Sequence, residues 1–419
     1  MKPLPASFLT GRPKIVGSPR LYDYYRSYPF SALRKARNMT AEGIVAELLA
    51  SGLRGRGGAS FPVGLKWQSV MQQAETVRYV VANGEEGEPG TYKDRVLLEQ
   101  NPLAVIEALV IAGCTVKAER GYIYLNQNYR AIEKALLQLL QWLREEGRLR
   151  CVEGAGAFDI QVRRGRQRYI SGEETALFRA LEGRRAEPTG RPPYPTEQGL
   201  WGKPTVINNI ETLASVSLII ERGDSWFAAI GPEHNHGPKL FSLSGDVARP
   251  DVIEADMSAT LADLIGWAGG TVGTFKGAFV SGPSGRLFLP RDLSLPLTIQ
   301  NGCGNGTVIV FNDTRCAVDL ARQVTDFFHS EHCGQCLPGR ESMKQAKALM
   351  DGLENQAALE PVLQHYQQLH AVLLNSSKCG LCSSGTGIVP ALMQAFPADF
   401  ARHLRHDCPI CRAGAEVAA

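Results

Sequence analysis

The sequence predicts an α/β domain, followed by a small α+β module and a helical C-terminal region. Three observations support this division. Strands and helices alternate between residues 79 and 147, short strands and turns begin at about Lys239, and helical segments return from Ala317 to Arg405. We therefore place the three domains at residues 1–235, 236–312 and 313–419.

Composition and charge narrow the class of protein. The chain of 419 residues is 44% hydrophobic and 21% charged, with a net charge of +3, which argues against nucleic acid as the main partner. The longest apolar run, around 102–116, contains Glu107 and is too short to span a membrane. The first residues lack the apolar stretch of a secretory signal, so we expect a cytoplasmic protein whose ten cysteines are thiols or metal ligands rather than disulfides.

The elements of the first domain follow from hydrophobic periodicity. Residues 1–40 look irregular, and helices are expected at 41–50, 102–117 and 130–147. Strands are expected at Tyr79–Ala82 and 121–126, and the Pro- and Gly-rich stretch 190–202 should be a loop. Strands separated by helices of this length indicate a parallel component in the sheet. In the second domain, one helix is expected at 259–268.

A glycine-rich loop follows the first predicted helix. Gly55, Gly57 and Gly58 allow backbone N–H groups to approach a phosphate closely, and Arg54, Arg56 and Lys66 add positive charge. A tight turn explains the glycines equally well, and the loop does not match the Rossmann or P-loop fingerprints.

Three further motifs each have a structural and a functional interpretation. Asn83, Glu85, Glu86 and Glu88 form a solvated turn or accept hydrogen bonds from the hydroxyls of a nucleotide. The pair Glu173-Glu174 after Gly172, and the pair Asn208-Asn209 before Thr212, are typical of helix caps. The Asn pair could also read the polar edge of a flavin ring.

The cysteines near the C-terminus indicate a metal centre. Cys333-x2-Cys336 and Cys379-x2-Cys382 offer four soft ligands that suit an iron–sulfur cluster or a zinc ion. Cys408-x2-Cys411 is a metal pair, a redox pair or a tail with incidental thiols, and we favour the tail or a half-site completed by a partner. Cys114, Cys151, Cys303 and Cys316 have no spacing partner and are expected to be structural, and His403 and His406 to form a basic helix end.

Four motifs together carry a resemblance. GLRGRGGASFPVGLKW, NGEEGEPGTYKDR, SGEETALFRALEG and LWGKPTVINNIETLASV occur in this order, and the chain from about Arg34 to Phe400 resembles the flavoprotein subunit of respiratory complex I that oxidises NADH. The same family includes the diaphorase subunits of NAD-reducing hydrogenases and NAD-dependent formate dehydrogenases. The resemblance implies that bound FMN accepts a hydride from NADH and relays single electrons to a [4Fe-4S] cluster.

The resemblance also implies site residues and partners. The implied FMN contacts are Gly55, Arg56, Gly57, Lys66, Asn83, Glu85, Glu86, Gly172, Glu173, Glu174, Asn208, Asn209 and Thr212. The implied NAD(H) contacts are Phe61, Glu88, Glu174 and Tyr194. A ubiquitin-like module of the SLBB type is implied at about 239–310, before a helical bundle that holds the cluster. The implied partners are a thioredoxin-like [2Fe-2S] subunit and further electron-acceptor subunits of a larger complex, which could place the chain at the cytoplasmic face of a membrane.

The chain departs from the family pattern at four places. Gly339 stands where the third cluster cysteine is expected, so either Cys382 replaces it or the cluster is lost. We favour replacement, with Cys382 beside Cys333, Cys336 and Cys379, because the chain still offers four thiols. Arg166 and Arg168 replace small residues and could pair with a 2′-phosphate, or could simply be exposed. The other departures are Arg191 and Tyr194 for Lys and Phe, and Gln68-Ser69 in place of an aromatic residue.

These departures leave two alternatives to the electron-input subunit. One is a redox-silent or flavin-free structural subunit of a larger complex, and the other is an NADPH-specific relative.

Overall fold

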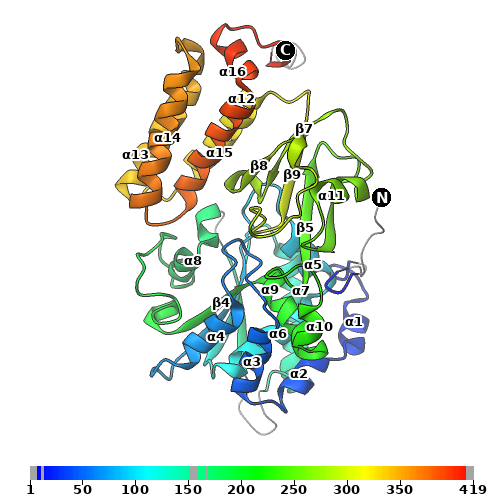
Figure 1. Cartoon of the computed structure of the whole chain (residues 1–419). Coiled ribbons are helices and arrows are strands. Elements are labelled where there is room, and N and C mark those ends of the chain that lie inside the picture. Colours follow the sequence, from blue (N-terminus) through cyan, green and yellow to red (C-terminus); the bar gives the residue numbers. More distant parts are fainter. Residues whose placement is uncertain (1–6, 11–13, 151–157, 166–167, 412–419) are drawn as a thin grey trace.

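The computed structural model describes residues 7–10, 14–150, 158–165 and 168–411. Figure 1 shows a first sheet at one end of the molecule, with a second sheet and a helical bundle side by side above it. The first domain consists of a parallel four-stranded sheet with the strand order β3-β2-β1-β4. Its strands are β1 (Tyr79–Gly84), β2 (Arg120–Leu125), β3 (Asp159–Arg164) and β4 (Thr205–Asn209).

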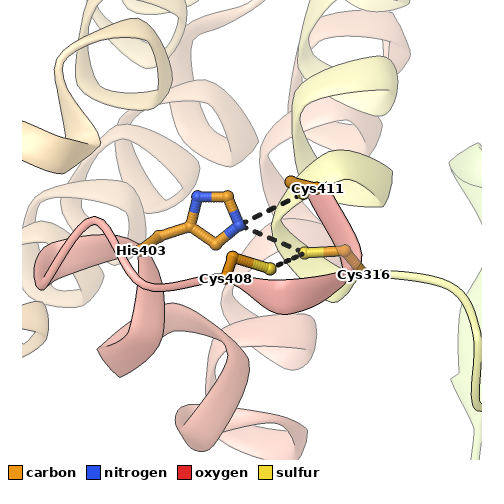
Figure 2. A group of neighbouring side chains, drawn as sticks. All are labelled: Cys316, His403, Cys408 and Cys411. Carbon is orange, nitrogen blue, oxygen red and sulfur yellow. Dashed lines mark hydrogen bonds between the residues drawn. The ribbon is translucent and has the colours of Figure 1, made fainter. Parts of the chain in front are cut away.

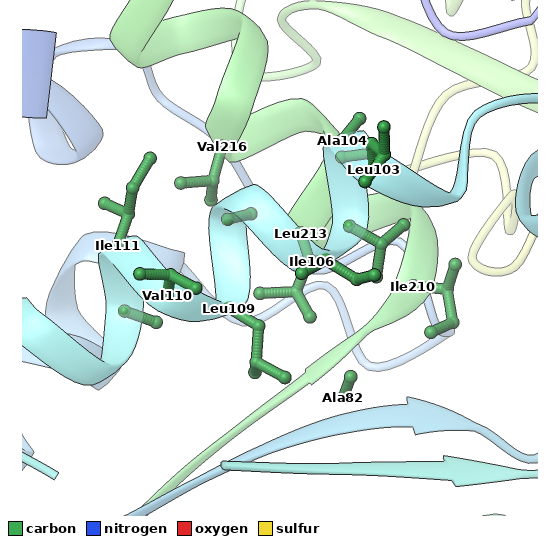
Figure 3. Packing of buried hydrophobic residues seen from close by; sticks show 14 of the residues in the cluster. Ala82, Leu103, Ala104, Ile106, Leu109, Val110, Ile111, Ile210, Leu213 and Val216 are labelled. Carbon is green, nitrogen blue, oxygen red and sulfur yellow. The ribbon is translucent and has the colours of Figure 1, made fainter. Parts of the chain in front are cut away.

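Helices cover both faces of the first sheet. On one face, Val80 and Ala82 pack in the largest core cluster with the buried sides of the N-terminal helices and of those that connect the strands. Figure 3 shows Ala82 below the helices at 102–115 and 210–222, which contribute Ile106 and Leu213 to this cluster. On the other face, Val81 packs against Leu177 and Phe178 of a single short helix. The helices of this domain are α1 (Leu21–Ser27), α2 (Ser31–Ala36), α3 (Ala41–Ala50), α4 (Val63–Met71), α5 (Lys93–Gln100), α6 (Pro102–Thr115), α7 (Arg130–Glu145), α8 (Glu174–Leu181), α9 (Ile210–Arg222) and α10 (Asp224–Ala228).

The second sheet has five strands in the order β6-β5-β9-β7-β8. The first and last strands of the module, β5 and β9, lie parallel at its centre, and the other pairs are antiparallel. One helix, α11 (Leu261–Trp267), packs its apolar residues into the core of the module. The strands are β5 (Pro238–Gly245), β6 (Asp251–Asp256), β7 (Phe275–Val280), β8 (Arg286–Phe288) and β9 (Thr307–Asn312).

The C-terminal region is a bundle of helices with its own core, in which Phe328, Met343, Tyr366 and Val389 are fully buried. The bundle also contacts β8 and the short turn Gly282–Ser284 of the second sheet. Its helices are α12 (Ala317–Glu331), α13 (Leu337–Asp351), α14 (Leu359–Ser376), α15 (Leu381–Ala395) and α16 (Pro397–Leu404).

Two expectations about local structure are wrong. The segment expected to be irregular contains α1 and α2, whose Tyr24, Tyr25 and Leu33 are buried in the main core, so an amphipathic face stabilises short helices that the Pro- and Arg-rich sequence hides. Cys114 is disulfide-bonded, so the expectation that all ten cysteines are free thiols or metal ligands is wrong for this residue.

Within the described ranges, no single helix is long and apolar enough to cross a membrane. Helices α5 and α6 meet the length and composition of a span only as a pair, and that pair bends by 95°.

Candidate functional site

A cavity of about 440 Å³ opens where the carboxyl ends of β1 and β4 meet the second sheet and the bundle. Ligands of open parallel sheets bind at this edge, because the loops that follow adjacent strands converge there. The lining residues are Gly57, Gly58, Asn83, Glu85, Glu86, Gly87, Glu88, Thr91, Lys93, Asp94, Tyr169, Ile170, Gly172, Glu173, Asn209, Ser281, Ser284, Gly285, Gly302, Gly304, Asn305, Cys379, Gly380, Leu381 and Ser384.

The glycine-rich loop contributes Gly57 and Gly58 to this cavity. A Cβ at Gly304 would lie 2.7 Å from the carbonyl oxygen of Gly58, so the loop before β9 approaches the glycine-rich loop more closely than a residue with a side chain would allow. Gly55 closes the loop through an N–H bond to the carbonyl of Phe61, at 2.9 Å. The loop therefore presents backbone, rather than side chains, to the cavity.

Arg56 does not face the cavity. Its guanidinium is buried, lies 3.2 Å from the sulfur of Met257 and donates to the carbonyl of His236. Its backbone N–H donates to the hydroxyl of Thr212, which is itself fully buried. Arg56 and Thr212 therefore fix the position of the loop from behind.

Glu85 carries an unpaired acceptor at the cavity wall. Its Oε1 accepts from Asn126 Nδ2 at 2.7 Å, while its buried Oε2 has no hydrogen-bond partner among the residues that the structure describes. Burial raises the pKa of this carboxyl to about 7. Asn83 accepts from the N–H of Glu85 and donates to the carbonyl of Gly172, which holds the acidic loop and the turn before α8 together. A buried acceptor without a partner fits a ligand that carries hydroxyl or N–H donors, such as FMN.

Glu86 and Glu88 are engaged with the protein. Glu86 accepts from the backbone N–H groups of Asp94 and Arg95 at the start of α5 and from the hydroxyl of Tyr129. Burial raises its pKa to about 7. Glu88 accepts from the hydroxyl of Tyr169 and from the N–H of Ser284, and burial raises its pKa. Glu88 thus links the first domain to the second sheet across the cavity.

The Glu pair lies at the N-terminus of α8. Glu173 caps this helix by accepting from the N–H groups of Thr175 and Ala176. Arg191 bridges both carboxylates, at 2.5 Å from Glu173 and 2.9 Å from Glu174. Lys66 lies 3.4 Å from Glu174 and donates to the carbonyl of Ile207 at 3.0 Å. Among Glu173, Glu174 and Lys66, only Glu173 lines the cavity.

The Asn pair ends β4. Asn208 accepts from the indole N–H of the buried Trp67 at 2.9 Å, so it fixes α4 against the sheet. Asn209 lines the cavity, caps α9 by accepting from the N–H of Glu211, and donates to Asp94. Asn209 therefore agrees with both interpretations of the Asn pair, because it caps a helix and also lines the cavity.

A buried charge network behind the cavity was not predicted from the sequence. Lys93 lines the cavity and lies 2.7 Å from Asp94 and 2.9 Å from Glu211. Lys239, from β5, lies 2.7 Å from the same Glu211, and burial lowers its pKa to about 8. Lys93 and Asp94 stand inside the motif GTYKDR, but nothing in their spacing reveals that two lysines share one carboxylate.

The residues implied for NAD(H) binding differ in exposure. Phe61 and Tyr194 are 51% and 54% exposed, which leaves their rings open to a stacking partner. Glu88 and Glu174 are paired within the protein, as described above.

The four predicted metal ligands converge from two segments. Cys333, Cys336, Cys379 and Cys382 line one small cavity together with Gly339. A Cβ at Gly339 would lie 2.9 Å from Cys336 Sγ and 3.1 Å from Cys382 Sγ, so the Cys382 sulfur stands where a side chain at 339 would extend. Cys382 lies in the first turn of α15. The donor set therefore fits a four-thiolate cluster despite the glycine at 339.

The two cavities share a wall. Ile170, Cys379 and Leu381 line both the 440 Å³ cavity at the sheet edge and the small cavity that the four cysteines line, called the cysteine cavity below. Burial raises the pKa of the Cys379 thiol to about 11, so a cationic centre is needed to hold it as a thiolate. One cysteine of the metal site is therefore also part of the wall of the large cavity.

Cys408 and Cys411 lie beside two further side chains of this chain that can bind a metal ion. These neighbours are Cys316 and His403, which were expected to be a structural thiol and part of a basic helix end (Figure 2). The group is hidden in the sequence because Cys316 lies 87 residues before His403.

A first prediction concerns Glu85. Because its folded pKa of about 7 lies above the ordinary 4.5, folding takes up a proton between these values, and stability falls as pH rises from about 4.5 to about 7. This difference in pKa corresponds to a loss of about 3 kcal/mol in the free energy of unfolding of the apoprotein. Glu85→Gln should remove this part of the decline of stability with pH, measured by urea unfolding, whereas Glu42→Gln, at an exposed position, should leave it unchanged. An unchanged pH slope in Glu85→Gln would contradict the burial argument.

Comparison with known proteins agrees with this geometry. Residues 48–218 match the Nuo51 FMN-binding domain, and residues 319–403 match the NADH-ubiquinone oxidoreductase-F iron-sulfur binding region. The second match includes Cys333, Cys336, Cys379 and Cys382 but not Cys316, Cys408 or Cys411.

Relatives cover nearly the whole chain. An NADH-quinone oxidoreductase subunit of Aquifex aeolicus is 38% identical over 91% of this chain and 90% of that protein. The NADP-reducing hydrogenase subunit HndC of Solidesulfovibrio fructosivorans is 33% identical over 93% of this chain and 82% of that protein. A chain of an NAD⁺-reducing [NiFe]-hydrogenase in the H₂-reduced state superposes with a TM-score of 0.83 and 34% identity, over 92% of this chain and 67% of that one.

These matches agree with the glycine-rich and acidic loops at the sheet edge and with the cysteine cavity that shares their wall. The chain therefore belongs to the family of FMN-binding, iron–sulfur flavoprotein subunits found in NADH-quinone oxidoreductases and in NAD-reducing hydrogenases.

Proposed function

We propose that this chain is the electron-input subunit of a multi-subunit oxidoreductase that oxidises NADH. The observation that carries the proposal is the shared wall, because Ile170, Cys379 and Leu381 line both the nucleotide-sized cavity and the cysteine cavity. Electrons leaving a cofactor in the first cavity would meet the metal centre directly behind that wall. Bound FMN supplies the chemistry, since a flavin takes up a hydride and gives up electrons singly.

The protein's own part is binding and positioning. Gly57 and Gly58 would present backbone to the phosphate, with the positive charge of Lys93 at the same cavity wall. Glu85 and Asn83 would hold hydroxyl and ring-edge groups at the carboxyl end of β1, and Asn209 would do so from β4. Arg56, Asn208, Thr212 and Glu86 support these groups from behind.

The nicotinamide nucleotide would enter over the open side of this cavity. The exposed rings of Phe61 and Tyr194 offer stacking surfaces, and Glu88 and Glu174 offer carboxylates to ribose hydroxyls. None of these groups needs to move a proton, because the hydride passes between the two cofactors.

The module between residues 236 and 312 is proposed to be ubiquitin-like, of the SLBB type. The strand order β6-β5-β9-β7-β8, with parallel first and last strands at the centre and one helix, supports this assignment. Ser281, Ser284 and Asn305 from this module line the cavity, so its loops would close the site against water.

The partners are proposed to be a thioredoxin-like [2Fe-2S] subunit and further electron-acceptor subunits, with the assembly in the cytoplasm or at the cytoplasmic face of a membrane. Support comes from the relatives, which are named as subunits of a quinone oxidoreductase and of hydrogenases.

We expect NADH to be preferred over NADPH. Glu174 would repel a 2′-phosphate, and Arg168, one of the two arginines considered for that phosphate, donates to the carbonyl of Ser330 on α12. Arg166 lies outside the described residues. The ratio of kcat/KM for the two nucleotides, measured with an artificial acceptor, should favour NADH and should stay unchanged in the Arg168→Ala variant. A preference for NADPH that this variant abolishes would show the opposite.

The visible spectrum of the purified protein tests the function itself. The electron-input subunit should show flavin and iron–sulfur absorption, and anaerobic NADH should bleach the flavin bands. A colourless protein, or one whose flavin does not respond to NADH or NADPH, would instead indicate the flavin-free or redox-silent structural subunit.

A further inference from the structure

A second group of metal-binding side chains lies at the far end of the bundle. Cys316 precedes α12, His403 lies in α16, and Cys408 and Cys411 follow α16. Their ligand atoms all lie within 4.8 Å of one another (Figure 2). None of these four residues is among those that line the cysteine cavity, so this group is separate from it. The three cysteines also lie outside the region that matches the iron–sulfur family.

The distances fit a single tetrahedral ion. His403 Nε2 lies 3.3 Å from Cys316 Sγ and 3.5 Å from Cys411 Sγ, and the sulfurs of Cys316 and Cys408 are 3.9 Å apart. Zinc–ligand bonds of about 2.3 Å to sulfur and about 2.0 Å to nitrogen, at tetrahedral angles, require sulfur–sulfur edges of about 3.8 Å and sulfur–nitrogen edges of about 3.5 Å. An iron–sulfur core would not fit between atoms this close.

The histidine is oriented as a ligand. Nδ1 of His403 lies 3.3 Å from a carboxylate oxygen of Glu354, which in turn lies 2.8 Å from Arg322. A carboxylate on Nδ1 fixes the proton there and leaves the lone pair of Nε2 for the centre of the group. Metal-bound histidines characteristically have such a partner on their other nitrogen.

The set is complete and enclosed. Cys316, His403 and Cys408 are 3%, 4% and 6% exposed, and Cys411 is partly buried. Four protein ligands leave no open position for a substrate or a water, which is the arrangement of structural rather than catalytic zinc.

We propose that Cys316, His403, Cys408 and Cys411 bind one structural zinc ion. The ion joins the segment after α16 to the junction between β9 and α12. Asp399 of α16 reinforces this junction, because it accepts from the N–H of Ala317 and pairs with Lys276 of β7. The zinc thus fastens the end of the described chain to the second sheet and the bundle at once.

Elemental analysis and zinc-edge X-ray absorption on the purified wild-type holoprotein test the proposal. We expect about one zinc per chain, in addition to the iron, with three sulfur neighbours and one nitrogen neighbour. Protein from zinc-containing medium that holds no stoichiometric zinc, or that holds zinc bound only by four sulfurs, would overturn it. A Cys408–Cys411 disulfide found by mass spectrometry after alkylation would do the same.

Variants separate this site from the iron–sulfur site. Cys408→Ser with Cys411→Ser should lose the zinc and keep the iron and flavin, whereas Cys303→Ser, at another buried cysteine, should keep all three. Zinc retained in the double variant would contradict the assignment.

The role of Glu354 has its own test. Glu354→Gln should weaken zinc binding about 10- to 100-fold in competition with a chelator, and the exposed Glu360→Gln should leave it unchanged. An affinity equal to wild type in Glu354→Gln would contradict the orienting contact. Removal of zinc should also speed tryptic cleavage at the exposed Arg405, since the ion holds the residues on both sides of it.

Discussion

Replacing Asn83 and Glu85 together with alanine should lower the affinity for FMN about 100-fold. Among the residues that the structure describes, the buried Oε2 of Glu85 has no hydrogen-bond partner, and Asn83 fixes the backbone of the same loop. A hydrogen bond to a charged group contributes about 1.5–3 kcal/mol and a neutral one about 1 kcal/mol. The sum, about 3 kcal/mol, corresponds to two powers of ten in the dissociation constant. Fluorescence titration of the apoprotein with FMN measures the change directly.

Glu86 is left in place in this variant. It accepts from two backbone N–H groups at the start of α5 and from Tyr129, so its loss would damage the fold as well as the site. The exposed Glu42→Ala serves as the control and should bind FMN like the wild type. An unchanged FMN affinity in the double variant, with an unchanged circular dichroism spectrum, would refute the assignment of these two residues.

The largest expected effect at the metal site comes from Cys382→Ala. This variant removes the sulfur that stands at the position of the family's third ligand, and we expect the iron and sulfide content to fall from about four of each per chain to one quarter or less. Cys303→Ala removes a buried cysteine elsewhere and should retain the cluster. Chemical analysis of iron and acid-labile sulfide gives the result.

A second substitution should restore the cluster. Gly339→Cys in the Cys382→Ala background returns the third ligand to α13. The alanine removes the sulfur that would lie 3.1 Å from a Cβ at 339, and the side chain of Cys336, whose sulfur would lie 2.9 Å from that Cβ, has to shift. We expect iron and sulfide to recover to more than half of wild type. Full cluster content in Cys382→Ala alone would show that another group holds the fourth iron.

Much of the fold was predictable because hydrophobic periodicity depends on local sequence. The helix at 41–50 is confirmed residue for residue as α3, and the strands and helices expected between 79 and 147 are confirmed within two residues at their ends. The N-terminal helices were missed, since their buried faces consist of tyrosines and isolated apolar residues rather than a regular stripe.

Side-chain direction was less predictable than position. Arg56 sits in a glycine-rich loop beside the cavity, yet its guanidinium points into the interior toward Met257 and His236. Spacing in the sequence cannot show this, because the partner residues lie 180 and 201 positions away. The sharing of Glu211 by Lys93 and Lys239, and the meeting of Cys316 with His403, were hidden for the same reason.

The predicted replacement of the third cluster ligand by Cys382 could be reasoned from the sequence, because chemistry restricts the candidates. A cubane needs four donors, glycine offers none, and Cys382 is the thiol closest in sequence to Cys379. The structure adds the geometry, with the sulfur of Cys382 next to the Cβ position at Gly339. What the sequence could not supply is the wall that Cys379 shares with the nucleotide-sized cavity.

Electron paramagnetic resonance of the anaerobic protein after addition of NADH tests the central claim most directly. If electrons pass from the flavin cavity through the shared wall to the cysteine site, NADH should produce the signal of a reduced [4Fe-4S] cluster in the wild type and in Cys303→Ala, and none in Cys382→Ala. Flavin bands bleached by NADH without any iron signal in the wild type, although dithionite reduces the cluster, would contradict the electron-input function.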